Sequence, residues 1–369
     1  MRTRLVTGVA VLTLVAGPLL GGCQRAVPGD AGVSAVEQQK ADRRTEQRTA
    51  VDAALKALEN QPVAVFHSTL NGTDLMLRVT KDGTVFGSLP VDGQAAQIIE
   101  VDKQLYVAAS ADYWTARGST AGDRYAKGWA RAAVSDLPVD PATSLTPSGA
   151  AEKLRKSVSG FDQLAEPVRT KLADGTEVFE AGGSAGLKVT TASPHRLVSF
   201  APSLLDAKGK ALGAEMRVDP VTPETVTKFR DELSAAVGGL GAPADSVAQV
   251  SVTITDNKLD CNGGSGSCTS TVSMENAVVG GDTNSSTVRI VMTSVVSADE
   301  LGSQTCTGEV NAAPNTASTI PCTVKFTVPN RTAQYRVTSL PTAVGDVFAS
   351  LDVNAIKQKI QSEFSALGG

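Results

Sequence analysis

The chain has 369 residues, of which 41% are hydrophobic and 4% aromatic, and its formal net charge at pH 7 is −4. This length suffices for two domains of ordinary size, and the apolar fraction suffices for cores built from Val, Leu, Ile and Ala. The slight excess of acid and the lack of a long basic run argue against nucleic acid as a partner. The same charge pattern argues against a folded domain that binds an anionic lipid surface through its own side chains.

Residues 1–22 have the layout of a secretion signal that ends at a cysteine. A basic start precedes an apolar run, the run ends in small residues, and Cys23 follows directly. A generic secretory signal needs no cysteine after its cleavage site. The run contains Gly and Pro and falls short of the ~20 apolar residues that a membrane-spanning helix needs. An uncleaved membrane helix and an ordinary signal-peptide cysteine are the alternatives.

This arrangement resembles the lipobox of bacterial lipoproteins. The resemblance implies that Cys23 becomes the first residue of the mature protein and carries a diacylglyceryl group, with palmitate as a typical acyl chain. Each buried CH₂ contributes ~0.8 kcal/mol, so two or three acyl chains anchor a protein stably. We therefore expect an exported bacterial lipoprotein, held at the outer face of the cell membrane through Cys23. Removal of the signal changes the net charge from −4 to −6.

A tether and a helix are expected next. Residues 23–35 are rich in Ala, Gly and Pro, which is typical of a flexible tether. Residues 35–60 follow a helical period, with Val51 and Leu55 on one apolar stripe. The pair Gln61-Pro62 should end this helix, because the residue before a proline disfavours helical geometry.

The following segment predicts an antiparallel meander of strands. Asn71-Gly72 and Asp82-Gly83 are strong hairpin signals between alternating apolar and polar residues. Further strands are expected up to residue 218, with helices over residues 123–131 and 146–160 among them. Thr222 is expected to cap one more helix, and the Gly-rich residues 238–243 are expected to form a hinge.

The second half of the chain predicts a β-sandwich. Val-, Thr- and Ser-rich runs alternate with polar turns from residue 245 onward, and residues 331–337 are expected to add a strand. Apolar residues then recur with helical spacing over residues 344–351 and again over residues 356–367, so two C-terminal helices are expected.

Four cysteines besides Cys23 lie in this second half. An even set in an exported chain indicates disulfides, and three pairings are possible. We favour Cys261–Cys268 and Cys306–Cys322, because each pair brackets a turn between strand-like runs. A zinc site would need closer spacing and histidine partners, and this half of the sequence contains no histidine.

No catalytic, cofactor or metal motif emerges from the sequence. Gly182–Gly186 matches the nucleophile-elbow pattern around Ser184, but a strand-like run follows it where a helix is required. His195 is the only histidine downstream, and no acid lies between it and Ser184. We therefore expect a glycine-rich hairpin there, no enzymatic activity, no cofactor and no metal.

The first half also resembles the LppX/LprG lipid-binding lipoproteins of actinobacterial envelopes, relatives of the LolA carrier fold. The likeness covers residues ~35–220 and is carried by residues 75–83, by Gln104-Leu105-Tyr106-Val107 and by Asp112-Tyr113-Trp114. It implies a half-barrel that holds acyl chains. Those lipoproteins usually end after the half-barrel, so the second domain is a departure from their pattern.

The expected fold is therefore α+β: a curled antiparallel sheet packed with helices, then a disulfide-stapled, immunoglobulin-like β-sandwich and C-terminal helices. We place the signal at residues 1–22, the tether at 23–35, the first domain at 36–241 and the second at 245–369.

The expected function is non-catalytic binding of a lipid or another hydrophobic ligand, and the alternative is a structural or protein-interaction lipoprotein with no ligand cavity. The second domain would contact an envelope protein or act as a spacer. The candidate lining residues are Leu75, Leu77, Val79, Ile98, Leu105 and Val107.

Overall fold

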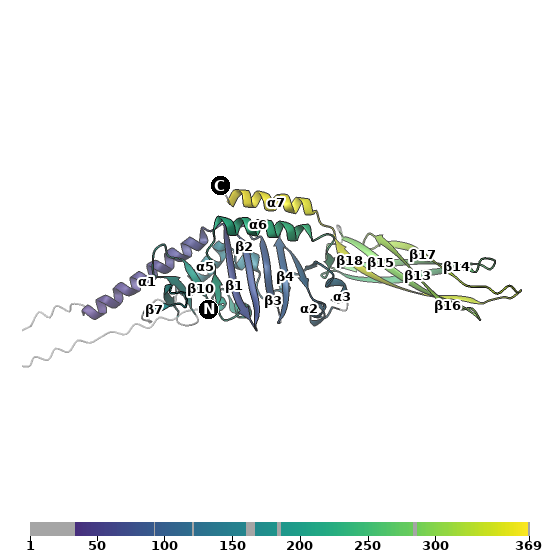
Figure 1. The fold of residues 1–369 in the computed structure, drawn as a ribbon, viewed down its shortest axis with the longest axis horizontal. Coiled ribbons are helices and arrows are strands. Elements are labelled where there is room, and N and C mark those ends of the chain that lie inside the picture. Colours follow the sequence, from purple (N-terminus) through teal and green to yellow (C-terminus); the bar gives the residue numbers. More distant parts are fainter. Residues whose placement is uncertain are drawn as a thin grey trace, which may run out of the picture.

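The computed structural model describes residues 34–91, 93–119, 122–159, 167–182, 186–282 and 286–367. Its fold is mixed α+β, with strands in two sheets and helices layered on one of them. The molecule is elongated (Figure 1). A helix-covered sheet, here called the first module (residues 35–240 with the C-terminal helix), forms one part. A β-sandwich (residues 249–349) extends from it.

The sheet of the first module is antiparallel, apart from one short parallel pairing at its border with the sandwich. Asn71 and Gly72 adopt positive φ angles of 52° and 79°, as the predicted Asn-Gly hairpin turn requires. The strands are β1 (Val63–Leu70), β2 (Thr73–Thr80), β3 (Val85–Val91), β4 (Gln94–Val101), β5 (Gln104–Ala109), β6 (Ala130–Ala132), β7 (Val168–Lys171), β8 (Glu177–Ala181), β9 (Leu187–Thr190), β10 (Leu197–Phe200) and β11 (Met216–Val218).

Two helices cover one face of this sheet, here called the α1 face. Helix α1 (Ala35–Glu59) begins with a capping box, in which Ser34 and Glu37 bond each other's backbone N–H. Only its second half is buried, through the predicted stripe, so its first half is a polar, exposed rod. Helix α5 (Pro147–Val158) lies beside it, and the hydroxyl of its N-cap Thr146 accepts from a backbone N–H, as predicted.

Short helical segments complete the first module. They are α2 (Ala111–Ala116), α3 (Gly122–Tyr125), α4 (Pro141–Ser144) and the 3₁₀ turns η1 (Val134–Asp136), η3 (Pro202–Leu204) and η4 (Ala207–Leu212).

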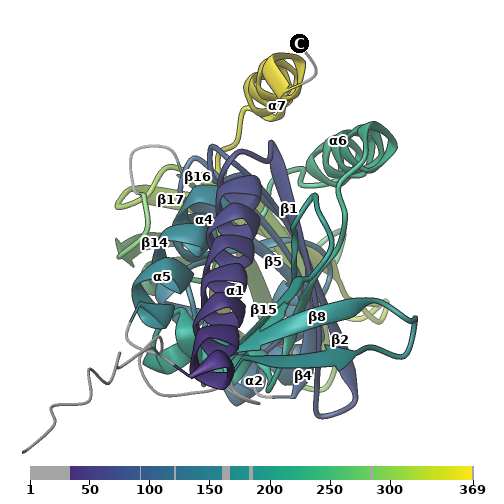
Figure 2. The ribbon, with the colours of Figure 1, turned by 90° about the vertical axis from the view of Figure 1, so that its left-hand side faces the viewer.

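The opposite face, here called the α6 face, carries α6 (Pro223–Gly238) and the C-terminal helix α7 (Val353–Leu367). Phe229 of α6 and Phe364 of α7 meet edge to face, with ring centroids 5.2 Å apart. The Thr84 hydroxyl donates to Glu363 at 2.8 Å, which ties α7 to the turn between β2 and β3. In Figure 2, α6 and α7 lie at the top of the view, with α1 and α5 below them.

The sandwich consists of two three-stranded layers of long strands. One layer contains β13 (Gln249–Asn262), β14 (Ser267–Val279) and β17 (Ala317–Lys325), and the other contains β15 (Ser286–Ala298), β16 (Gly302–Ala312) and β18 (Val337–Ala349). Burial alternates along β14 and β15, so one side of each strand faces the core and the other faces solvent.

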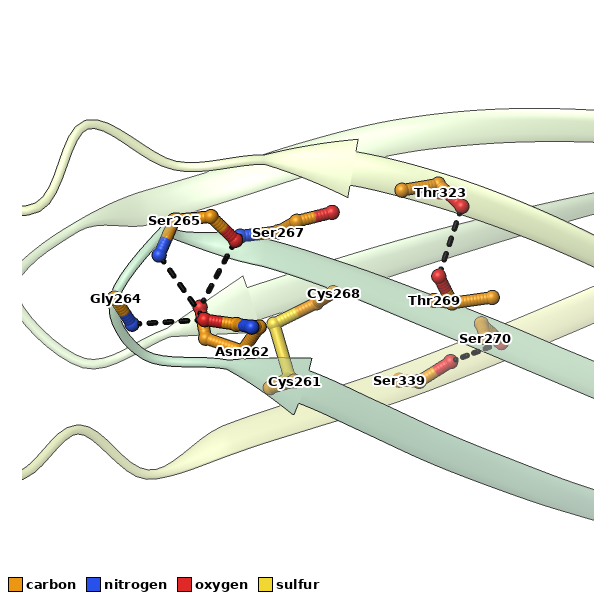
Figure 3. The surroundings of a disulfide bond; sticks show 10 residues. All are labelled: Cys261, Asn262, Gly264, Ser265, Ser267, Cys268, Thr269, Ser270, Thr323 and Ser339. Carbon is orange, nitrogen blue, oxygen red and sulfur yellow. Dashed lines mark hydrogen bonds between the residues drawn. A yellow bond between two sulfur atoms is a disulfide. The ribbon is translucent and has the colours of Figure 1, made fainter.

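Both predicted disulfides are present. Cys261–Cys268 links directly opposed residues of β13 and β14 beside their turn (Figure 3). The side-chain oxygen of Asn262 shapes that turn by accepting from the backbone N–H groups of Gly264 at 3.0 Å and Ser265 at 3.1 Å. Cys306–Cys322 joins β16 to β17 and therefore connects the two layers.

The sandwich is continuous with the first module. Strand β12 (Ala244–Asp245) pairs with β6 on one side and with β18 on the other. All described strands except β13, β14 and β17 thereby belong to one 15-stranded sheet that runs from β16 to β7 without closing on itself. A salt bridge between Arg131 and Asp245, whose side chains are 12% and 0% exposed, reinforces this seam. The C-terminal helix lies on the first module, although its sequence follows the sandwich.

Three expected elements differ from the structure. Residues 344–351 were expected to be helical, but β18 extends to Ala349, so α7 is the only C-terminal helix that the described residues form. Residues 331–336 form no regular strand, and β18 starts at Val337. Residues 123–131 are helical only at their start, because Gly128 lies in a bend and Ala130 already belongs to β6.

Of the helices in the described part of the chain, none combines the length and hydropathy needed to cross a bilayer.

Candidate functional site

The six predicted lining residues lie together on the α1 face. Leu75, Leu77 and Val79 of β2, Ile98 of β4, and Leu105 and Val107 of β5 belong to one buried cluster with α1 and α5. None is more than 1% exposed. The alternation of the strands therefore brings the predicted residues to one surface, as expected from their period of two.

That surface is filled by protein side chains. Ala50 and Ala54 of α1 and Ala150 and Ala151 of α5 are all fully buried in the same cluster. Their small side chains let the helices pack closely onto the sheet. Between α1 and strands β10 and β11 there remains a hollow of about 30 Å³, lined in part by Ala54 and Val218. This is close to the volume of one water molecule, far below the ~300 Å³ of a small-molecule site.

Sequence reasoning missed a buried carboxyl on the same face. Glu100 of β4 is 2% exposed, and its Oε2 atom has no hydrogen-bond partner among the described residues. Burial, with a smaller contribution from nearby Asp140, raises the pKa of Glu100 to about 7, although a hydrogen bond from the backbone of Ala142 opposes the shift. The sequence contains a sign of this buried carboxyl. Glu100 lies on the same side of the strand as Ala96 and Ile98, which face the core, so an apolar residue is expected at its position.

The two histidines of the chain, His67 and His195, both make local contacts. His67 forms an ion-pair contact with Asp219 at 2.8 Å, and the His195 ring bonds the backbone oxygen of Thr190 at 2.9 Å. Each histidine thus holds a local structural contact. Ser184 lies outside the described residues, as does Cys23. Among the residues that the structure describes, no three His, Cys, Asp or Glu side chains are grouped to hold a metal ion.

In comparisons with known proteins, the chain matches no family model and no curated protein.

Proposed function

We propose that this protein is an envelope lipoprotein, anchored through Cys23, that holds its β-sandwich away from the membrane for contact with another envelope protein. In this proposal the first module is a LolA-type half-barrel with a filled interior, and the sandwich is an immunoglobulin-like module. No covalent chemistry is involved. The observation that carries the proposal is the position of the two ends: the free half of α1 and the sandwich project from opposite ends of the molecule (Figure 1).

The exposed half of α1 supports a role as a spacer. Residues 35–46 are exposed along the whole helix surface, and charged side chains dominate them. A helix that is polar all round either bridges solvent or relies on side-chain pairs for its stability. Glu46, at the inner end of this segment, pairs with Arg169 of β7 at 2.5 Å. At ~1.5 Å rise per residue, the part of the helix before Glu46 adds roughly 15 Å between the tether and the first module.

The seam between the modules supports rigidity. Strand β12 continues the sheet from one module into the other, and the Arg131–Asp245 salt bridge lies across it. Helix α7 returns from the sandwich to the α6 face, so the chain crosses between the modules twice. A partner surface on the sandwich would then be held at a fixed distance from the anchor.

Energy transfer from the protein to a dye in the bilayer tests this arrangement. An azide-bearing residue, introduced at exposed Val36 or at Asp299 in the distal β15–β16 turn, is coupled to a donor fluorophore without disturbing the cystines. In lipidated protein on vesicles, transfer should be strong from position 36 and weak from position 299. A Cys23→Ala protein should not bind the vesicles. Equal transfer from both positions would mean that the molecule lies flat, and the proposal would be wrong.

The second candidate is the lipid carrier that the resemblance implies. One observation favours it: apart from Glu100, the α1 face is an apolar surface that includes all six predicted residues, and the helices that cover it contribute small alanine side chains beside Val51, Leu55 and Leu154. Withdrawal of α1 would expose a surface suited to acyl chains, at ~25 cal/mol per Å² of apolar area. Native mass spectrometry of protein produced without residues 1–22 distinguishes the candidates. A co-purifying lipid supports the carrier, and a lipid-free mass supports the filled half-barrel.

A further inference from the structure

A second hollow lies at the seam between the two modules, well away from the α1 face. It has a volume of about 740 Å³, within the ~300–1,000 Å³ typical of ligand sites. One wall comes from the first module, through Trp114, Arg117 and Tyr125 around α2 and α3. The other wall comes from the sandwich, through Gln249 at the start of β13 and Asp346 near the end of β18. Figure 1 shows α2 and α3 at the end of the first module that faces the sandwich.

The two walls are fixed relative to each other. Arg124 of α3 forms a salt bridge with Asp346 of β18 directly across the hollow. Ser246, which also lines it, donates its hydroxyl hydrogen to the backbone oxygen of Arg131 at 2.7 Å. Because β12 also joins the modules at this point, the hollow exists without any ligand, and little conformational ordering would oppose binding.

Aromatic groups form part of the lining. The rings of Trp114 and Tyr125 meet edge to face, with centroids 5.3 Å apart. Arg117 is held over the Tyr113 ring, 3.8 Å from its centroid, and donates to the Tyr113 backbone oxygen at 3.1 Å. The buried indole N–H of Trp114 has no acceptor among the described residues. That nitrogen has almost no accessible surface and Trp114 is only 2% exposed, so the indole lies just behind the surface of the hollow.

The charges of the lining exclude strongly charged and purely apolar ligands. Arg117, Arg124, Asp136 and Asp346 all line the hollow, so the formal charges of these four side chains sum to zero. An anion or a cation would meet a repulsive group for each attractive one and would have to displace the Arg124–Asp346 pair. An apolar ligand would desolvate these charges without replacing their hydrogen bonds. Burial raises the pKa of Tyr125, so its hydroxyl remains a neutral donor and acceptor.

We propose that this pocket binds a neutral, hydroxyl-rich ligand, namely a short oligosaccharide. Guanidinium, carboxylate and amide groups are planar, paired donors and acceptors that match neighbouring hydroxyls, and aromatic rings contact the C–H faces of pyranoses. The pocket combines both kinds of group with zero net charge. This site is independent of the anchor and of the proposed spacer function.

Calorimetry and tryptophan fluorescence with three neutral trisaccharides test the proposal: tri-N-acetylchitotriose, maltotriose and mannotriose, with inorganic phosphate as the charged probe. Trp114 and Trp129 are the only tryptophans of the chain, so a Trp129→Phe variant reports on the pocket alone. At least one trisaccharide should bind saturably and shift the Trp114 emission. Calorimetry on the unmodified protein provides the same answer if Trp129→Phe does not fold.

A matched pair of variants locates the binding. Gln249→Phe fills the mouth of the pocket with an exposed side chain and should weaken trisaccharide binding at least tenfold. Gln304→Phe makes the same change at an exposed position of β16, outside the pocket lining, and should leave binding unchanged. The proposal is overturned if no trisaccharide binds, if both variants behave alike, or if phosphate binds more tightly than every sugar.

Discussion

The two modules build their cores in different ways. The first module packs large apolar side chains from many elements into a cluster on each face of its sheet, and Phe66, Phe179 and Phe200 belong to the larger cluster. The sandwich has two smaller clusters, and buried hydroxyls lie between them. Ser270 and Ser294 are fully buried there, and both bond the hydroxyl of Ser339.

This difference explains where the cystines are. The first module, residues 35–240 with the C-terminal helix, contains no cysteine, whereas the sandwich contains two disulfides. Two long, narrow layers with serine inside bury less apolar surface per residue than a sheet covered by helices. A covalent link that constrains the unfolded chain compensates for that smaller contribution. We therefore expect apolar truncation to affect the first module most, and loss of cystines to affect the sandwich alone.

The largest effect is expected for Phe66→Ala. Phe66 is fully buried and meets Phe200 edge to face at 6.1 Å. Removing a buried phenyl ring costs about 3–5 kcal/mol, through lost burial and the cavity that remains. Urea unfolding followed by tryptophan fluorescence measures this cost, because both tryptophans lie in the first module. Val295→Ala, at a 39% exposed position of the sandwich, is the control and should leave the fluorescence midpoint unchanged. A loss below ~1 kcal/mol for Phe66→Ala would contradict the tightly packed α1 face.

The next effect is expected for the double variant Cys306→Ala with Cys322→Ala. These cysteines are separated by 16 residues, and closing such a loop contributes roughly 3 kcal/mol. The sandwich should unfold at lower urea concentration by circular dichroism, while the tryptophan transition of the first module keeps its midpoint. Removing Cys261–Cys268, with a separation of 7 residues, should cost about 0.7 kcal/mol less. If the circular dichroism and fluorescence transitions shift together, the two modules unfold as one unit, and the cystines do not stabilise the sandwich alone.

Local signals predicted the fold better than long-range ones. The Asn71-Gly72 turn, the stripe of α1 and the cap at Thr146 each depend on neighbouring residues, and all three are confirmed. Val344, Val347 and Leu351 satisfy a helical spacing, but pairing with β15 makes the segment a strand up to Ala349. Tertiary contacts override such short patterns.

For the candidate site, alternation along the strands was enough to place the six apolar residues on one face. Whether that face encloses a hollow depends on how closely α1 and α5 approach it, which no local pattern encodes. The bridge through β12 and the return of α7 are likewise contacts between residues far apart in sequence. The pocket at the seam follows from these contacts, so it could not be predicted from the sequence.

A pH-dependent effect is expected for Glu100→Gln. The folded-state pKa of Glu100 is about 7, above its ordinary value of 4.5, so the folded protein favours the protonated carboxyl. The stabilising effect of that proton is complete below about pH 4.5 and is lost as the pH rises through about 7. Glutamine does not ionise and avoids this loss. At pH 8 the variant should therefore be more stable than the parent by up to about 3 kcal/mol, and at pH 4 the two should be equal. A stability difference that does not change with pH would contradict a buried, protonated Glu100.

The smallest effect is expected in the serine layer of the sandwich. Ser294→Ala removes the hydroxyl that bonds Ser339 at 2.8 Å and Ser270 at 3.3 Å, and should cost about 1 kcal/mol. Replacing Ser270, Ser294 and Ser339 together by alanine leaves none of the three hydroxyls unpaired, so the triple variant should cost less than the sum of its single variants. Denaturant unfolding followed by circular dichroism measures the difference. Additive costs would show that the three hydroxyls act separately, whereas a smaller total would show that they form one network whose members stabilise the sandwich only while all are present.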